Sequence, residues 1–280
     1  MKIICENTRG ETIEFYRTPL WIGSIDGIGA DYEVLTSKNS GQDGENYNGS
    51  TAAKRPIVVV LDVKRVDYVA QRNRLYNFFQ PRITGAFYYY EGTNGKKINY
   101  KVEKVTPTGG DGPIKHIMLS LICPDPKFYA LDEEITNFIT LQGNIKFPLK
   151  IVSPFTVATK VITLIKNVYN SSNVAQGLTV KFASTGVVVN PSLYDMQLLK
   201  KMQVNITMQQ GDTITVTTGD NNKRVTLTRA GVTTNINNLM AYPPVWLQAQ
   251  QGDNLYRFNA ESGIDSLSVS ILHTQAYWGA

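Results

Sequence analysis

The sequence predicts an all-β protein with a minor α-helical part, divided into two domains. The 280-residue chain is 42% hydrophobic and 18% charged, as expected of a globular protein. Residues with strand preference (Val, Ile, Thr, Tyr and Phe) are plentiful. Short alternating segments separated by Gly, Asp and Asn turns run through residues 211–272. A chain of this length suits two domains of ordinary size, each with its own core.

The first half opens with three segments of strand character, residues 2–5, 12–16 and 32–35. Residues 21–29 are rich in glycine but lack the Lys-Ser/Thr pair and the helix of a phosphate loop, so we expect a bulged turn there. Residues 36–51 form a long polar stretch rich in Gly and Asn. This stretch is either a mobile surface loop or an arm that orders against a neighbouring subunit.

Residues 67–79 are the one helix that the sequence predicts. Asp67 can cap it, and Tyr68, Leu75 and Phe79 fall on one face at helical spacing. A proline two residues further on ends it. The aromatic face therefore suits packing on a sheet.

Strands flank this helix on both sides. Residues 56–63 are apolar on both faces and predict a buried strand. Residues 84–91 and 98–105 surround an Asn-Gly turn at residues 92–95 and predict a hairpin. Three consecutive tyrosines in its first strand alternate between the two faces, so they cannot form one stacking platform. Residues 114–123 are the next long strand.

The polar transition after residue 131 predicts the domain boundary. We expect a first β domain at residues 1–135 with its extended loop at 36–51, a linker at residues 136–147, and a β-sandwich at residues 148–280. The sandwich strands are expected to begin with residues 149–152 and to end with residues 267–272.

The distribution of charge narrows the classes of partner that the chain is expected to bind. Residues 1–140 hold 17 basic and 17 acidic side chains, and residues 141–280 hold 11 and 6. The basic residues do not cluster with aromatics, so no specific nucleic-acid binding is predicted.

No apolar run approaches the ~20 residues of a membrane span. The first residues lack the apolar core of a signal peptide, and we expect synthesis in a cytoplasm, with Cys5 and Cys123 as buried free thiols.

The sequence predicts no catalytic, cofactor-binding or metal-ligating residue. His116 lies within a strand and His273 follows one, and neither belongs to a hydrolase motif. Three of the six acids in the second half lie beside Gly or Asn and a fourth lies two residues after a Gly, which favours a role in turns. These four are Asp212, Asp220, Asp253 and Asp265.

Several motifs, in this order, resemble the distal tail proteins of long-tailed, non-contractile bacteriophages and related prophages. In the first half they are the helix and strand at residues 73–89 and the run Cys-Pro-Asp-Pro-Lys-Phe-Tyr at 123–129. In the second half they are Gly-Asp at 211–212 before a Thr-rich strand, residues 225–231, and Gly-Asp-Asn at 252–254 followed by Phe258. The last turn lacks the proline that the family usually has there.

The resemblance implies a fold, partners and a location. Its first domain would be a β-sandwich with one helix that assembles a homo-hexameric ring, and its second a galectin-like β-sandwich outside the ring. The ring would join the tail tube protein to tail-tip and tail-associated proteins and let DNA pass. Receptor-binding proteins are further candidate partners, and residues 36–51 would form an arm reaching an adjacent subunit. The protein would be located at the distal tail tip of a virion.

The main alternative is a carbohydrate-binding module that contacts host glycans. Trp246, Arg257, Asn259 and Glu261 are side chains of the kinds that bind sugars. Trp246, however, lies between two apolar residues after two prolines, which favours packing in a core. An enzyme such as a tail peptidoglycan hydrolase is a third hypothesis, for which the sequence offers little support.

Overall fold

The computed structural model describes residues 1–41, 43–109, 112–143, 158–220 and 222–280. They form two compact units, residues 1–131 with 276–280, and residues 132–275. These bounds differ from the expected 1–135, 136–147 and 148–280. The last residues return to the first unit because β27 (Ala276–Tyr277) pairs with β10 (Phe128–Ala130).

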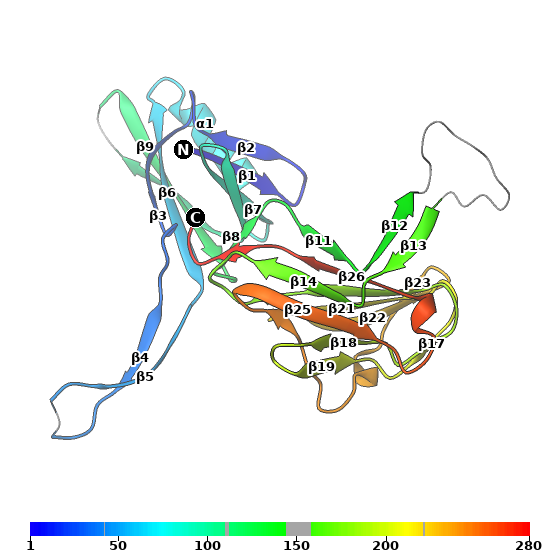
Figure 1. The fold of residues 1–280 in the computed structure, drawn as a ribbon. Helices are drawn as coiled ribbons and strands as arrows, with labels where there is room; N and C mark the ends of the chain where they lie inside the picture. The colour runs from blue at the N-terminus through cyan, green and yellow to red at the C-terminus, as the bar shows by residue number, and fades with distance from the viewer. Residues whose placement is uncertain (42, 110–111, 144–157, 221) are drawn as a thin grey trace. The chain divides into compact units, whose positions relative to one another are not determined.

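The nine main strands of the first unit are joined by hydrogen bonds into one continuous antiparallel sheet (Figure 1). Side chains on β1 and β6 alternate between buried and more exposed, because successive residues point to opposite faces. The strands β10 and β27 join this sheet through β8. Its main path runs β2 (Thr12–Phe15), β1 (Lys2–Asn7), β7 (Thr84–Glu91), β8 (Asn94–Gly109), β9 (Ile114–Cys123), β6 (Arg55–Lys64) and β3 (Trp21–Asp26).

The helix α1 (Tyr68–Phe78) is the one predicted at residues 67–79. Leu75, Phe78 and Phe79 are buried in the same core as the inner face of the sheet. Asp67 stands at the N-cap, but its side chain makes no capping hydrogen bond. The reason is its helical backbone conformation (φ −96°, ψ −7°), since a capping residue normally needs an extended one.

Two segments of the first unit are more regular than expected. Residues 21–26 form a full edge strand, β3, and the expected bulge lies between Ile22 and Ser24. The polar stretch expected as a loop at 36–51 forms most of a hairpin, β4 (Glu33–Ser37) with β5 (Asn46–Thr51). Sequence patterning did not reveal β5 because neither face of it is buried.

The second unit is a β-sandwich of two antiparallel main sheets (Figure 1). The four-stranded sheet has the order β14 (Ile165–Asn170), β25 (Gly252–Asn259), β18 (Ser192–Asp195) and β19 (Lys200–Gln203). The six-stranded sheet has the order β11 (Glu134–Asn137), β26 (Leu267–His273), β16 (Thr179–Ser184), β21 (Thr213–Gly219), β22 (Asn222–Arg229) and β23 (Val232–Asn235).

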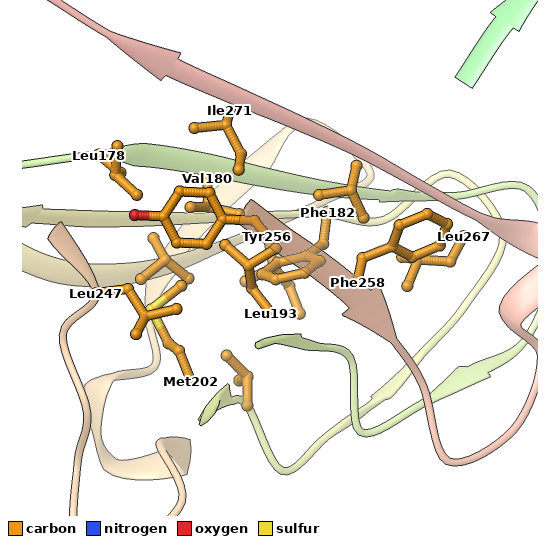
Figure 2. Close-up of a cluster of buried hydrophobic side chains, with 14 of the residues drawn as sticks. Leu178, Val180, Phe182, Leu193, Met202, Leu247, Tyr256, Phe258, Leu267 and Ile271 are labelled. Carbon is orange, nitrogen blue, oxygen red and sulfur yellow. The ribbon is translucent and has the colours of Figure 1, made fainter. Parts of the chain in front are cut away.

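The core of the second unit fills the space between these sheets. Val180 and Phe182 come from the six-stranded sheet, and Tyr256 and Phe258 from the four-stranded one (Figure 2). The rings of Phe138 and Phe258 meet edge to face at 5.4 Å, an arrangement worth about 1 kcal/mol beyond the area it buries.

Shorter elements complete the second unit. The strand predicted at residues 149–152 lies outside the described residues, and β12 falls within the segment expected as a linker. The remaining elements are β12 (Ile139–Gly143) with β13 (Ala158–Ile162), β15 (Gln176–Gly177) with β24 (Gln248–Ala249), β17 (Val188–Val189) with β20 (Thr207–Met208), and the 3-10 turns η1 (Asn237–Leu239) and η2 (Ile264–Ser266).

Candidate functional site

The most conspicuous exposed feature of the first unit is the β4–β5 hairpin, residues 33–51, which we call the arm. Its two strands pair only with each other among the described residues. A bulge between Leu35 and Thr36 shifts the register, so that Val34, Tyr47 and Ser50 lie on one face. Val34 is 58% exposed and Tyr47 67% exposed. A lone two-stranded hairpin is marginally stable in water, so this one is suited to ordering on another surface.

The base of the arm is held by Arg55, the first residue of β6. Its guanidinium is buried and donates to backbone carbonyls on three segments. Nε reaches the Pro126 oxygen at 2.7 Å, and Nη1 reaches the oxygen of Gly27 at 2.8 Å and also that of Gly29. Nη2 reaches the oxygen of Trp278 at 2.5 Å. Burial lowers the pKa of this guanidinium, and the carbonyl dipoles provide its hydrogen bonds in place of water.

The backbone at this base leaves no room for a side chain. Gly27 has φ +85°, and a Cβ there would come within 1.9 Å of the Pro56 carbonyl oxygen. The terminal Ala280 amide donates to the Ile28 oxygen at 2.9 Å. Residues before the arm, after it and at the end of the chain therefore meet at one anchor.

The two histidines form structural pairs and face no nucleophile in the contacts that the described residues make. His116 Nδ1 lies 2.7 Å from Asp62 Oδ1 on neighbouring strands, and both side chains are partly exposed. His273 is buried, with Nε2 3.4 Å from a Glu134 carboxylate oxygen and 3.3 Å from the Tyr169 carbonyl oxygen. Neither arrangement resembles a hydrolytic triad.

The four acids expected in turns each accept a hydrogen bond or lie in a 3-10 turn, but Asp253 lies within the strand β25 and not in a turn. Asp212 is 2% exposed, accepts the Gln209 amide at 2.7 Å and binds the Arg229 guanidinium through both oxygens. The hydrogen bond from Arg229 lowers the pKa of this carboxyl. Asp220 accepts from Gln248 at 2.9 Å, Asp253 accepts from Asn167, and Asp265 lies in η2. In the described part of the chain no three metal-ligating side chains gather.

The cysteines are free and buried, as predicted. Burial raises the pKa of the Cys123 thiol to about 12 and raises that of Cys5 well above its usual value. Both thiols are therefore buried and protonated at neutral pH, which makes them poor nucleophiles.

The four candidate sugar-binding side chains do not form one exposed set. Trp246 is partly buried and packs against the core, as its apolar neighbours suggested. Arg257 and Asn259 project from the outer face of β25, and Glu261 accepts from the amide of Asn190. Tyr194, which sequence reasoning missed, pairs in register with Arg257. Only the strand register could have revealed this neighbour.

No helix among the described residues has the length and apolar character needed to cross a bilayer.

No family model matches the chain, and no curated protein matches it. Its fold does match solved structures of phage tail components. One is the crystal structure of the SPP1 Dit (gp 19.1) protein, described as a paradigm of the hub adsorption apparatus in phages infecting Gram-positive bacteria.

The SPP1 Dit structure aligns with a TM-score of 0.70 at 14% identity and covers 98% of both chains. A chain of the phage P2 baseplate, in its activated conformation with Ca, aligns with a TM-score of 0.52 at 8% identity and covers 98% of both chains. The fold is thus that of the SPP1 Dit protein, all-β with one α-helix among the described residues. The chain follows this fold over nearly its whole length, and the resemblance predicted from the sequence motifs is confirmed at the level of fold. The galectin-like character of the second unit stays a prediction.

Proposed function

We propose that this chain is a structural protein of a phage tail, forming a six-membered ring that joins the tail tube to tail-tip proteins. The observation that carries the proposal is the fold, which follows that of a tail-hub protein from one end of the chain to the other. The ring would be located at the distal tail tip of the virion and would let DNA pass through its lumen. Its role is mechanical and involves no catalysis.

The arm supports assembly by self-association. It exposes apolar and aromatic side chains on a hairpin that lacks a third strand among the described residues. A ring requires a heterologous interface, in which one surface of a copy binds a different surface of the next. An anchored, protruding hairpin provides one of the two surfaces.

Light scattering coupled to size exclusion tests this proposal directly. The expected species has six times the 31.2 kDa mass of the chain, either alone or with a tail-tip partner. Negative-stain electron microscopy should then show closed rings. A protein that stays monomeric at high concentration, with and without tail partners, would overturn the proposal.

A further inference from the structure

The arm and the helix α1 lie at opposite ends of the strand β6. The strand begins at Arg55, just after the arm, and ends at Lys64, just before α1 (Figure 1). At about 3.3 Å per residue, its ten residues span roughly 30 Å. Two complementary surfaces at opposite ends of one strand meet most simply when they belong to two different copies. Such contacts join the copies head to tail, the arrangement that closes a ring.

One side of α1 carries side chains typical of protein interfaces: Tyr76 and Val69 are exposed, and Tyr68 is partly buried against the core of the first unit. The Arg72 guanidinium lies 5.9 Å from the ring centres of both Tyr68 and Tyr76, one helical turn away on each side. Next to these three side chains, Val66 is 88% exposed and Val69 is 57% exposed. Tyrosine and arginine are enriched at the centres of interfaces, and two exposed valines next to them add apolar area.

The helix segment and the arm carry opposite charge. Residues 64–82 hold five basic side chains (Lys64, Arg65, Arg72, Arg74 and Arg82) and one acid, Asp67. Residues 33–51 hold three acids (Glu33, Asp43 and Glu45) and one base, Lys38. In the part of the chain that the structure describes, no ion pair within 4 Å neutralises these five cations. Their charge is therefore free to attract an acidic partner.

We propose that the Tyr68–Arg72–Tyr76 face of α1 is the docking surface for the arm of a second copy of this chain. The proposal rests on the proposed ring and names its two complementary surfaces. The arm face that bears Val34 and Tyr47 packs on Tyr76 and Val69, and Asp43 and Glu45 of the arm meet Arg72. Because the two charged segments differ in sign, the contact selects the arm–helix pairing over arm–arm pairing.

Cross-linking between two separately labelled populations tests the contact. One population carries Tyr47→Cys in the arm and the other carries Val69→Cys on α1, and a short bis-maleimide joins thiols that come close. The native Cys5 and Cys123 are buried and stay unlabelled. Val187→Cys, at a valine of the second unit that is 56% exposed, replaces Val69→Cys as the matched control. We expect mixed dimers with Val69→Cys at several times the yield of the control.

Charge reversal tests the electrostatic part. Arg72→Glu should lower the cross-linked yield several-fold at low salt, and Asp43→Lys with Glu45→Lys on the arm population should restore it. Lys223→Glu with Arg224→Glu, an exposed basic pair in the second unit, should leave the yield unchanged. The attraction should also weaken as salt rises.

The outcomes separate this contact from the ring itself. Rings seen by electron microscopy, with a cross-linked yield no higher than that of the Val187→Cys control, would overturn the docking surface and leave the proposed function standing. Rings that tolerate the arginine reversal would overturn the charge pairing. Absence of both association and cross-links at high concentration would overturn the two proposals together.

Discussion

The Arg55 guanidinium donates to the carbonyl oxygen of Trp278 at 2.5 Å across 223 residues of sequence. Together with the pairing of β27 and β10, this bond makes the end of the chain part of the first unit. The first unit therefore reaches its final form only after the second unit has been synthesised. The arm shares this anchor, because Arg55 also binds carbonyls that precede the arm.

Removing the Arg55 side chain should weaken the first unit. Arg55→Ala leaves the buried carbonyls of Gly27, Pro126 and Trp278 without this donor, and we expect a loss of about 3 kcal/mol in unfolding free energy. Arg55→Lys should recover only part of it, because an ammonium cannot reproduce the planar fork of donors. Denaturant unfolding in a Trp246→Phe background, followed by the fluorescence of Trp21 and Trp278, measures the change. Equal midpoints for the wild type and Arg55→Ala would show that the anchor is not structural.

Two glycines near the anchor should differ in how much stability they lose when replaced by alanine. Gly27→Ala places a Cβ against the Pro56 carbonyl at positive φ and should cost roughly 2 kcal/mol or more. Gly29→Ala is the matched control, since its Cβ would meet nothing within 4 Å, and it should change stability by about 0.5 kcal/mol or less. Thermal unfolding of both variants checks this, and similar melting temperatures would contradict the geometry.

The buried carboxylate of Asp212 should make the second unit sensitive to acid. Its pKa in the folded state lies below that of the unfolded chain, which is about 3.9. The ion pair with Arg229 therefore stabilises the fold fully above that unfolded value, and the contribution is lost as the pH falls through the folded pKa.

Asp212→Asn should accordingly be less stable than the wild type at pH 7, with a gap that narrows towards pH 3. Urea unfolding across this range measures the gap. Asp132→Asn, at an exposed acid of the same unit, serves as the control. A gap independent of pH would mean that the carboxylate charge contributes nothing.

We expect Trp246 to stabilise the fold of the second unit and not to bind sugar. Its ring packs partly buried against the core of the second unit, so Trp246→Ala should cost roughly 2 kcal/mol, less than a fully buried tryptophan. Trp246→Phe should retain most of the stability. Unfolding curves and a glycan array on both variants check this. Saturable glycan binding that disappears in a fully stable Trp246→Ala protein would support the carbohydrate hypothesis.

Local patterns predicted much of the first unit. The helix at residues 67–79 and the strands at 56–63, 84–91 and 114–123 are confirmed, because each buries side chains at its own characteristic period. The hairpin turn is tighter than expected, with only Gly92 and Thr93 between paired residues. The arm strand β5 escaped prediction because an element that buries neither face leaves no periodic signal.

Pattern and composition in the chain were enough to establish an all-β protein with one helix, buried thiols and no motif for catalysis. The tertiary structure decided the features that depend on contacts between residues far apart in the sequence. It brought Arg55 to the end of the chain, set Tyr194 beside Arg257, and placed an acidic arm and a basic helix at the two ends of β6. Side-chain period is a local property that the sequence records, whereas strand order and long-range hydrogen bonds depend on the free energy of the whole packed chain.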